Sequence, residues 1–105
     1  MRRRRSDCRH AVYMITNTIT DDFYIGITVC AGRGLTVERA LRIRWQKHVR
    51  RALTEDKTWA LCRSIRTAGA ERHRMELLET VLGRAAAHRR ERALIRDYHP
   101  QLNVA

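Results

Sequence analysis

Two short apolar segments near the start of the chain have the composition of β-strands. Residues 12–15 (VYMI) and residues 23–27 (FYIGI) are rich in β-branched and aromatic side chains. The segment between them, residues 18–22, is largely polar and carries two aspartates, which favour turns. The pattern predicts a β-hairpin that places the phenol rings of Tyr13 and Tyr24 side by side.

A helical repeat follows after a loop that contains glycines. Thr36 is a suitable N-cap, because its hydroxyl can accept a hydrogen bond from a backbone N–H of the first turn. Apolar residues then recur at helical spacing, which predicts a helix with one face on the core. These residues are Val37, Leu41, Trp45, Val49 and Ala52. The rest of the helix is basic and carries Arg39, Arg42, Arg44, Lys47, Arg50 and Arg51.

The second half of the chain predicts three more elements. A helix over residues 58–68 has Gly69 as its expected C-cap. Its apolar face carries Leu61, Cys62 and Ile65. Residues 75–82 predict a third strand, although their spacing also suits a helix. A last helix over residues 84–97 stops before Pro100, which cannot continue it. The order β-β-α-α-β-α predicts an α+β domain with a small sheet.

The composition adds a strong positive charge. The chain has 105 residues and a formal net charge of +11, which indicates a polyanionic partner such as nucleic acid, with an anionic membrane as the rival. No apolar run approaches the roughly 18 residues that span a bilayer, so we expect no membrane partner. We expect a basic N-terminal arm over residues 1–10 and a single domain over residues 11–105. The arm is either a solvated tail or a phosphate-binding segment, and no apolar run follows it as in a signal peptide.

The cysteines argue against a disulfide-stabilised or zinc-stabilised domain. Cys8, Cys30 and Cys62 are far apart, and no two of them have the CxxC spacing of a zinc or redox motif. An odd and scattered set is typical of a reducing compartment. We therefore expect free thiols and no structural zinc.

A carboxylate interrupts the apolar face of the last predicted helix. That face carries Ala87, Glu91, Leu94, Ile95 and Tyr98. Burial of an unpaired carboxylate costs on the order of several kcal/mol, so Glu91 needs an arginine partner, a proton or a metal ion. His88 lies one turn earlier and forms a His-x-x-Glu pair with Glu91, which is a weak signal by itself.

Two other pairs carry groups that can act on phosphates. Arg44 and His48 are four residues apart on one face of the basic helix, where an arginine can clamp a phosphate and a histidine can transfer a proton. The same pair is also ordinary on a solvated basic face. Tyr13 and Tyr24 are either packing residues or bases, and as bases they need nearby positive charge, because the ordinary pKa of tyrosine is about 10.

In this order, the pieces resemble the motifs of the GIY-YIG nuclease family. Residues 11–13 (AVY) stand in the place of the first triplet, and residues 24–26 (YIG) match the second. Arg44, with His48 one turn later, resembles the arginine-bearing first helix of the family. Glu91 resembles its metal-binding glutamate.

The end of the chain extends this resemblance. Residues 98–103 (YHPQLN) resemble the closing stretch of the family, which ends in an asparagine, so the likeness covers residues 11–103. It implies a three-stranded antiparallel sheet flanked by helices. It also implies a divalent-metal-dependent endonuclease that hydrolyses DNA phosphodiesters, either by nicking or by double-strand cleavage.

The resemblance assigns a role to each candidate catalytic residue. Tyr13 would be the general base or would orient the attacking water, and Tyr24 would bind the phosphate or support that water. Arg44 would stabilise the charge that builds on the scissile phosphate. His48 would accept a proton from Tyr13 or position it. Glu91 would be the single protein ligand of one Mg²⁺ or Mn²⁺ ion.

A second group of residues is expected to contact the DNA backbone. Gly26 would allow a close approach to the phosphate, and Asn103 would anchor the site or bind the backbone. The full expected set is Gly26, Arg39, Arg42, Lys47, Lys57 and Asn103.

Two assignments stay open on the sequence. The long segment before Arg44 leaves Arg39 or Arg42 as substitutes for that arginine. Lys57 competes with His48 as the residue that handles the proton.

Other functions are compatible with the same charge. A non-catalytic nucleic-acid-binding module of the same fold needs only Lys and Arg, and a basic ribonucleoprotein component is a third alternative, although no array of stacking aromatics supports it. For a nuclease we expect DNA as partner, together with a homodimer or a second protein that supplies specificity. By resemblance we expect a phage or mobile-element product that is cytoplasmic and associated with the nucleoid.

Overall fold

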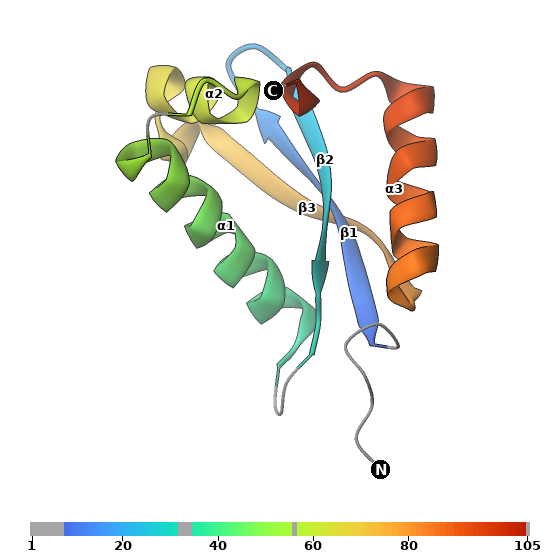
Figure 1. The fold of residues 1–105 in the computed structure, drawn as a ribbon. Helices are drawn as coiled ribbons and strands as arrows, with labels where there is room; N and C mark the ends of the chain where they lie inside the picture. The colour runs from blue at the N-terminus through green and yellow to red at the C-terminus, as the bar shows by residue number, and fades with distance from the viewer. Residues whose placement is uncertain (1–7, 32–34, 56, 105) are drawn as a thin grey trace.

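The protein folds as a three-stranded antiparallel sheet with helices on both sides (Figure 1). The structure is a computed structural model and describes residues 8–31, 35–55 and 57–104. The strands are β1 (Arg9–Asn17), β2 (Phe23–Val29) and β3 (His73–Leu82), and the helices are α1 (Val37–Thr54), α2 (Ala60–Ala68) and α3 (Arg84–Tyr98). Short 3-10 turns follow α2 (Ala70–Arg72) and α3 (Gln101–Asn103). The expected α+β class and the order β-β-α-α-β-α are confirmed.

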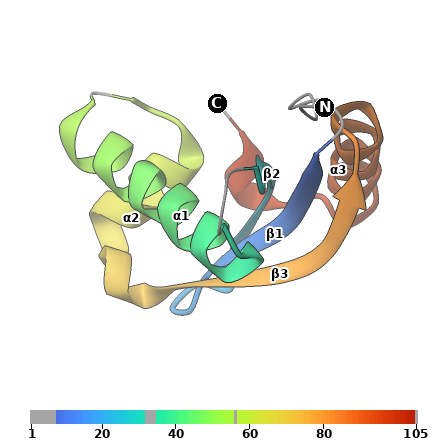
Figure 2. The same cartoon turned by 90° about the horizontal axis from the view of Figure 1, so that it is seen from below.

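The central strand β1 decides which side chains face which helices. The strand order is β2-β1-β3, and β1 pairs with both neighbours in the antiparallel sense. Successive side chains of a strand point to opposite faces. Tyr13 and Ile15 therefore face α1 and α2, whereas Val12 faces α3. Figure 2 shows α1 and α2 on one side of the sheet and α3 on the other.

The two faces of the sheet support two separate apolar clusters. The larger one lies under α1 and α2 and contains Tyr13, Ile15, Ala52, Leu61, Cys62, Ile65 and Leu102 among its buried members. The smaller one lies under α3 and consists of Val12, Ile25 and Leu94, with Ile95 packed against it. The predicted apolar face of α2 is therefore confirmed. Burial of such side chains stabilises the fold by about 1.5 to 3 kcal/mol each.

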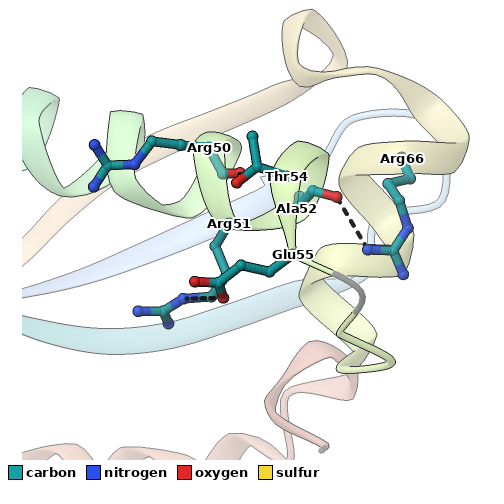
Figure 3. Close-up of polar contacts among 6 residues, drawn as sticks. All are labelled: Arg50, Arg51, Ala52, Thr54, Glu55 and Arg66. Atoms are coloured by element: carbon teal, nitrogen blue, oxygen red, sulfur yellow. Dashed lines mark hydrogen bonds and ion pairs between the residues drawn. The ribbon is translucent and has the colours of Figure 1, made fainter.

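Helix caps and a side-chain hydrogen bond fix the positions of α1 and α2. The hydroxyl of Thr36 accepts a hydrogen bond from the Arg39 backbone N–H at 3.1 Å, as expected for the N-cap of α1. Gly69 is the C-cap of α2 and adopts a positive φ of 95°, which favours glycine. Arg66 of α2 donates through Nη1 to the Ala52 carbonyl at 3.1 Å, so the last turn of α1 is tied to α2 (Figure 3).

The predicted apolar face of α1 is confirmed in part. Ala52 is buried, and Leu41 and Trp45 are partly buried and pack against the core cluster under α1 and α2. Val37 and Val49 are also only partly buried. Ala40 and His48 are buried as well, although the apolar pattern did not include them. The helix turns this histidine toward the sheet.

Tyr98 also departs from the prediction, because its side chain is 63% exposed. It points in the expected direction, since it borders a surface pocket together with Phe23 and Leu94. The last turn of α3 stands over that open pocket, and no further element covers it within the described residues. The helical spacing was right and the inferred burial was wrong.

Smaller differences concern the boundaries of elements. β1 begins at Arg9, inside the segment expected to form the basic arm, and residues 1–7 of that segment lie outside the described residues. α2 begins at Ala60, two residues later than expected, and β3 begins at His73, two residues earlier. Cys30 and Cys62 are free thiols. In the part of the chain that the structure describes, no helix is long and apolar enough to cross a membrane.

Candidate active site

The register of the hairpin brings the two candidate tyrosines together. Tyr13 of β1 lies opposite Gly26 of β2, and Ile15 lies opposite Tyr24. Paired residues point to the same face, so both phenols lie on the face that carries α1. Their ring centroids are 6.2 Å apart. The prediction that the two rings lie side by side is confirmed.

Gly26 makes room for this arrangement. A Cβ atom at this position would lie 2.6 Å from the hydroxyl oxygen of Tyr13 and 2.8 Å from Cε1 of Tyr24. Both distances are well below ordinary van der Waals contact. We expected the glycine to let the chain approach a phosphate, and the structure supplies another reason: any side chain here would displace the phenol of Tyr13.

Helix α1 adds an arginine and a histidine to the phenols. Tyr13 Oη and His48 Nε2 are 2.7 Å apart, within a buried hydrogen bond. Arg44 donates from Nε to the same hydroxyl at 3.3 Å. The His48 ring also packs edge-on against the Tyr24 ring, with centroids 5.4 Å apart. The arginine–histidine pair is therefore turned inward and is not a solvated basic face.

Burial determines the protonation of this cluster. It raises the pKa of Tyr13 well above its ordinary value, and the neighbouring Tyr24 raises it further. Burial also raises the pKa of Tyr24, although Arg44 opposes that shift. For His48, burial followed by the charges of Arg44 and Arg51 lowers the pKa to about 3. At neutral pH the phenols are protonated and His48 is neutral.

Glu91 of α3 lies at the same site. It lines a pocket of about 410 Å³ that also includes Tyr24, Arg44 and His88. Since Tyr24 and Arg44 belong to the α1 side and Glu91 to the α3 side, the pocket extends over β2, one of the two edge strands of the sheet. Substrate could thus reach groups from both helices at once.

The position of Glu91 makes ionisation of its carboxyl group less favourable. Burial raises the pKa of its carboxyl group, while His88, Arg92 and Arg44 act in the opposite direction. Its side chain is 21% exposed, and its ion pair is with His88 Nδ1 at 3.8 Å, rather than with the arginine partner that was one of the alternatives. A half-buried carboxylate that opens into a pocket is available to a cation.

The donor atoms fit a single oxygen-bound cation. Within the described residues, no group of three or more His, Cys, Asp or Glu side chains is arranged to hold a metal ion. Glu91 is the carboxylate that lines the pocket. Mg²⁺ commonly binds through one or two carboxylates and completes its shell with water and substrate phosphate oxygens. The residues present therefore fit Mg²⁺ or Mn²⁺.

The residues that follow α3 form hydrogen bonds with the edge of β2 next to the site. Asn103 accepts a hydrogen bond through Oδ1 from the Ile25 backbone N–H at 2.9 Å and donates from Nδ2 to the Ile25 carbonyl at 2.8 Å. Gln101 accepts from the Phe23 backbone N–H at 3.2 Å. These bonds satisfy the free edge of β2 beside Tyr24. Of the two roles expected for Asn103, this geometry matches the anchoring one.

The structure separates the alternatives that the sequence left open. Arg39 and Arg42 are exposed, and Arg42 borders a different pocket, with Trp45 and His73. Arg44 is the arginine that contacts Tyr13. The ammonium group of Lys57 lies 5.1 Å from the ring centroid of Trp59, whereas His48 bonds Tyr13 directly. Lys47, expected to bind phosphate, is exposed on α1.

Sequence reasoning missed two residues of this site. His10 is only 4% exposed, donates from Nδ1 to the Cys8 carbonyl at 2.8 Å and lines the pocket of Glu91. A single histidine at the start of a strand carries no periodic signal, so nothing in the sequence marked it. Arg51 lies seven residues after Arg44 and hence on the same face of α1, a spacing that could have identified it.

Comparison with known proteins gives a clear result for the fold. No known protein-family model matches the chain, and no curated protein matches its sequence. Among solved structures, the catalytic domain of the homing endonuclease I-TevI superposes with a TM-score of 0.66 at 20% identity, covering 90% of this chain and 94% of that domain. A glutamate-to-alanine mutant of the same catalytic domain gives a TM-score of 0.68 at 19% identity, covering 91% and 90%. The chain therefore has the fold of the catalytic domain of a GIY-YIG homing endonuclease, as the resemblance implied.

Proposed function

We propose that this protein is a divalent-metal-dependent endonuclease of the GIY-YIG type that hydrolyses DNA phosphodiester bonds. The observation that carries the proposal is the meeting of Tyr24, Arg44 and Glu91 in one pocket, with the Tyr13–His48 hydrogen bond behind it. The fold shared with an endonuclease catalytic domain and the net charge of +11 support it.

In the proposed reaction, Arg44 has two tasks. Its guanidinium holds the hydroxyl of Tyr13 through Nε at 3.3 Å, and its remaining N–H groups can donate to a phosphate in the pocket. An arginine fixed in this way stabilises the charge that develops on the scissile phosphate in the transition state. Tyr24, which lines the pocket, is placed to donate a hydrogen bond to the same phosphate or to the attacking water.

Tyr13 and His48 form the arm that orients the attacking water. Neutral His48 accepts the hydrogen bond of the Tyr13 hydroxyl through Nε2, and Arg44 donates to the same phenol oxygen, which keeps a lone pair for a hydrogen bond from water. The high pKa of Tyr13 and the low pKa of His48 both oppose proton transfer between them, so the pair positions the water and does not hold its proton. His48 fits this role better than Lys57, whose ammonium lies over Trp59.

Glu91 would hold the divalent cation. When bound, the cation would supply positive charge against the non-bridging oxygens of the scissile phosphate. Glu91 itself contributes a carboxylate whose burial makes it a better ligand than a solvated one, because less hydration is lost on binding.

A non-catalytic nucleic-acid-binding module is the second candidate. The same arginine-rich surface supports it, since phosphate contacts need no carboxylate. It does not account for Glu91, because a half-buried carboxylate in a basic pocket weakens the binding of a polyanion.

Cleavage of a supercoiled plasmid with Mg²⁺, Mn²⁺ or EDTA tests the proposal. We expect metal-dependent nicking or linearisation by the full chain. Glu91→Gln should reduce it by about a thousand-fold, because a cation at the phosphate contributes several kcal/mol. Glu76→Gln is the matched control, since it removes a carboxylate that lies on β3 and pairs with Arg74. Metal-independent cleavage, or full activity in Glu91→Gln, would contradict the proposal, and plasmid binding without cleavage would favour the binding module.

Thermal unfolding separates a lost site from a lost fold. The folded pKa of Glu91 is raised, so its contribution to stability is present below the unfolded pKa and is lost as pH rises. At neutral pH the carboxylate is thus a cost, and Glu91→Gln should unfold at the same or a higher temperature than the wild type. A clear loss of stability in this variant would mean that Glu91 is a structural residue.

A further inference from the structure

An exposed tryptophan lies between two cations beyond the end of α1. Trp59 is the N-cap residue of α2, and its side chain is 38% exposed. The guanidinium carbon of Arg51 lies 5.3 Å from the ring centroid, and the ammonium nitrogen of Lys57 lies 5.1 Å from it. Both distances are within the range of cation–π attraction. We call these three residues the Trp59 cluster.

Arg51 connects the Trp59 cluster to the candidate active site. Arg44, His48 and Arg51 are spaced by four and three residues, so they form one row along α1. The charge of Arg51 contributes to the low pKa of His48 and opposes the rise in the pKa of Tyr24. The row therefore runs from the pocket to the Trp59 cluster along a single helix face.

The backbone around the Trp59 cluster is held in place. Arg66 donates from Nη1 to the Ala52 carbonyl at 3.1 Å and from Nη2 to the Lys57 carbonyl at 2.6 Å. Arg51 also pairs with Glu55 at 3.6 Å, and Figure 3 shows its side chain leaving α1 in a different direction from that of Arg50. Because these groups are already ordered, the protein loses less conformational entropy when a ligand binds.

We propose that the Trp59 cluster binds a phosphate of the DNA backbone, one or two nucleotides away from the phosphate that is cut. This inference rests on the proposed nuclease function. The guanidinium of Arg51 lies over the ring of Trp59, and its Nε pairs with Glu55, which a phosphate would replace. Lys57 adds a second charge on the same ring.

The dimensions of helix and DNA set the spacing. Seven residues separate Arg44 from Arg51, which corresponds to about 10 Å along α1. Phosphates of one strand advance by about 3.4 Å per nucleotide along the axis of B-form DNA, and because the strand also winds around that axis, consecutive phosphates lie about twice as far apart in space. The cluster would therefore hold a phosphate one or two nucleotides from the one at Arg44, so that one DNA strand follows the row on α1.

DNA binding in EDTA tests the site without any cleavage. The affinity of the full chain for a short duplex is measured over a range of salt concentrations, for the wild type, Arg51→Gln and Arg50→Gln. Loss of one phosphate contact should lower the slope of log affinity against log salt by about 0.9 in Arg51→Gln. Arg50 is the control, because it is adjacent and exposed but lies outside the row. Equal slopes in Arg51→Gln and the wild type would overturn the proposal.

Substitution of the tryptophan separates orientation from charge. Trp59→Ala keeps both cations and should weaken binding by about two- to five-fold, as expected for an exposed cation–π contact, whereas Trp59→Phe should retain most of the affinity. Arg51→Lys keeps the charge and should restore the salt slope. If Trp59→Ala binds as the wild type does, the ring does not organise the site. Unfolding temperatures of all variants verify that each is folded.

Replacing single phosphates by uncharged linkages locates the phosphate that the Trp59 cluster binds, on a duplex whose cut position has been mapped. Single methylphosphonates are placed along the cut strand, and the penalty of each is measured for the wild type and Arg51→Gln. We expect one position, one or two nucleotides from the cut, where the penalty disappears in Arg51→Gln only. Penalties that persist at every position would overturn the assignment. Failure of the nuclease proposal would appear instead as absence of cleavage with Mg²⁺, while the salt slope in EDTA would still decide the phosphate site.

Discussion

Two hydroxyl–histidine pairs lie on the α1–α2 side of the sheet, and they have the same separation. Tyr13 Oη is 2.7 Å from His48 Nε2, and Ser64 Oγ is 2.7 Å from His73 Nε2. Either distance suits proton transfer. What distinguishes the two pairs is the set of groups around them.

The Tyr13–His48 pair is embedded in positive charge and connects to a carboxylate. Arg44 donates to the phenol, and the charges of Arg44 and Arg51 add to burial in lowering the pKa of His48. Tyr24 packs against both rings of the pair and borders the pocket that contains Glu91. These surroundings support the role that we propose for the pair in phosphodiester hydrolysis.

The Ser64–His73 pair belongs to a closed structural network. His73 donates from Nδ1 to the Gly69 carbonyl at 2.8 Å, so its Nε2 accepts the Ser64 hydroxyl. The side-chain amide of Asn17 donates from Nδ2 to Ser64 Oγ at 2.9 Å, and its Oδ1 accepts hydrogen bonds from backbone N–H groups of the turn after β1. The network links α2 to β1 and β3. The comparison shows that a short hydroxyl–histidine distance is no sign of catalysis unless charge and a reactive partner surround it.

Removal of one hydroxyl from each pair should give the largest difference in cleavage rate between the two pairs. Tyr13→Phe should reduce plasmid cleavage by about 10²- to 10⁴-fold, the range expected for a group that acts on the attacking water in the transition state. Ser64→Ala should leave the cleavage rate of the folded protein unchanged. Ser64 borders a surface pocket of about 540 Å³, so its hydroxyl can be reached and the test is a fair one. Equal losses in both variants would remove the distinction.

Gly26→Ala tests how strictly the first pair depends on its geometry. The new Cβ would lie 2.6 Å from the Tyr13 hydroxyl oxygen, so the phenol must shift away from His48 or β2 must move. We expect cleavage to fall strongly and the free energy of unfolding to drop by about 1 to 3 kcal/mol, as for an overpacked core. Thr80→Ala on β3 is the control, because that side chain is exposed. Unchanged cleavage in Gly26→Ala would show that the Tyr13–His48 distance is not critical.

Ser64→Ala should show its effect in stability. The change leaves Asn17 Nδ2 and His73 Nε2 without their partner, and unsatisfied polar groups in a partly buried network cost about 1 to 3 kcal/mol. Chemical denaturation measures this loss. Thr67→Ala, on the exposed side of the same helix, should cost less. If the two variants are equally stable, the network contributes little to the fold.

Local patterns were sufficient to predict most of the fold. The strands, the N-cap at Thr36 and the apolar face of α2 follow from residue types and spacing, because neighbours along the chain determine them. The two phenols were predicted to be adjacent for the same reason, since a tight turn fixes the register of a hairpin. Arg44, His48 and Glu91 were identified from the order of motifs.

Contacts between distant segments could not be read from the chain. The apolar pattern of α1 did not include His48, because its burial depends on Tyr13, which is 35 residues away. Tyr98 was expected in the core, yet it stands over an open pocket whose shape only the packed sheet and helix define. His10 reaches the pocket through the register of β1, and a lone polar residue at a strand end gives no periodic signal.

The pH dependence of stability sharpens the comparison by testing the charge around His48. The pKa of His48 is lowered from 6.5 to about 3 in the folded protein, so below pH 6.5 the unfolded chain binds a proton that the folded chain does not. Its contribution to stability is therefore present above pH 6.5 and is lost as pH falls toward 3, at no more than about 1.4 kcal/mol per pH unit.

Between pH 3 and pH 7, the free energy of unfolding should therefore change less with pH in His48→Gln than in the wild type. Tyr13→Phe provides the matched control: burial, Arg44 and Arg51 cause the low pKa of His48, and the phenol is not among these causes. That variant should keep the slope of the wild type while it loses cleavage. If His48→Gln and the wild type have parallel pH profiles, His48 is not held neutral by its surroundings. The cationic environment would then no longer distinguish the Tyr13–His48 pair from the Ser64–His73 pair.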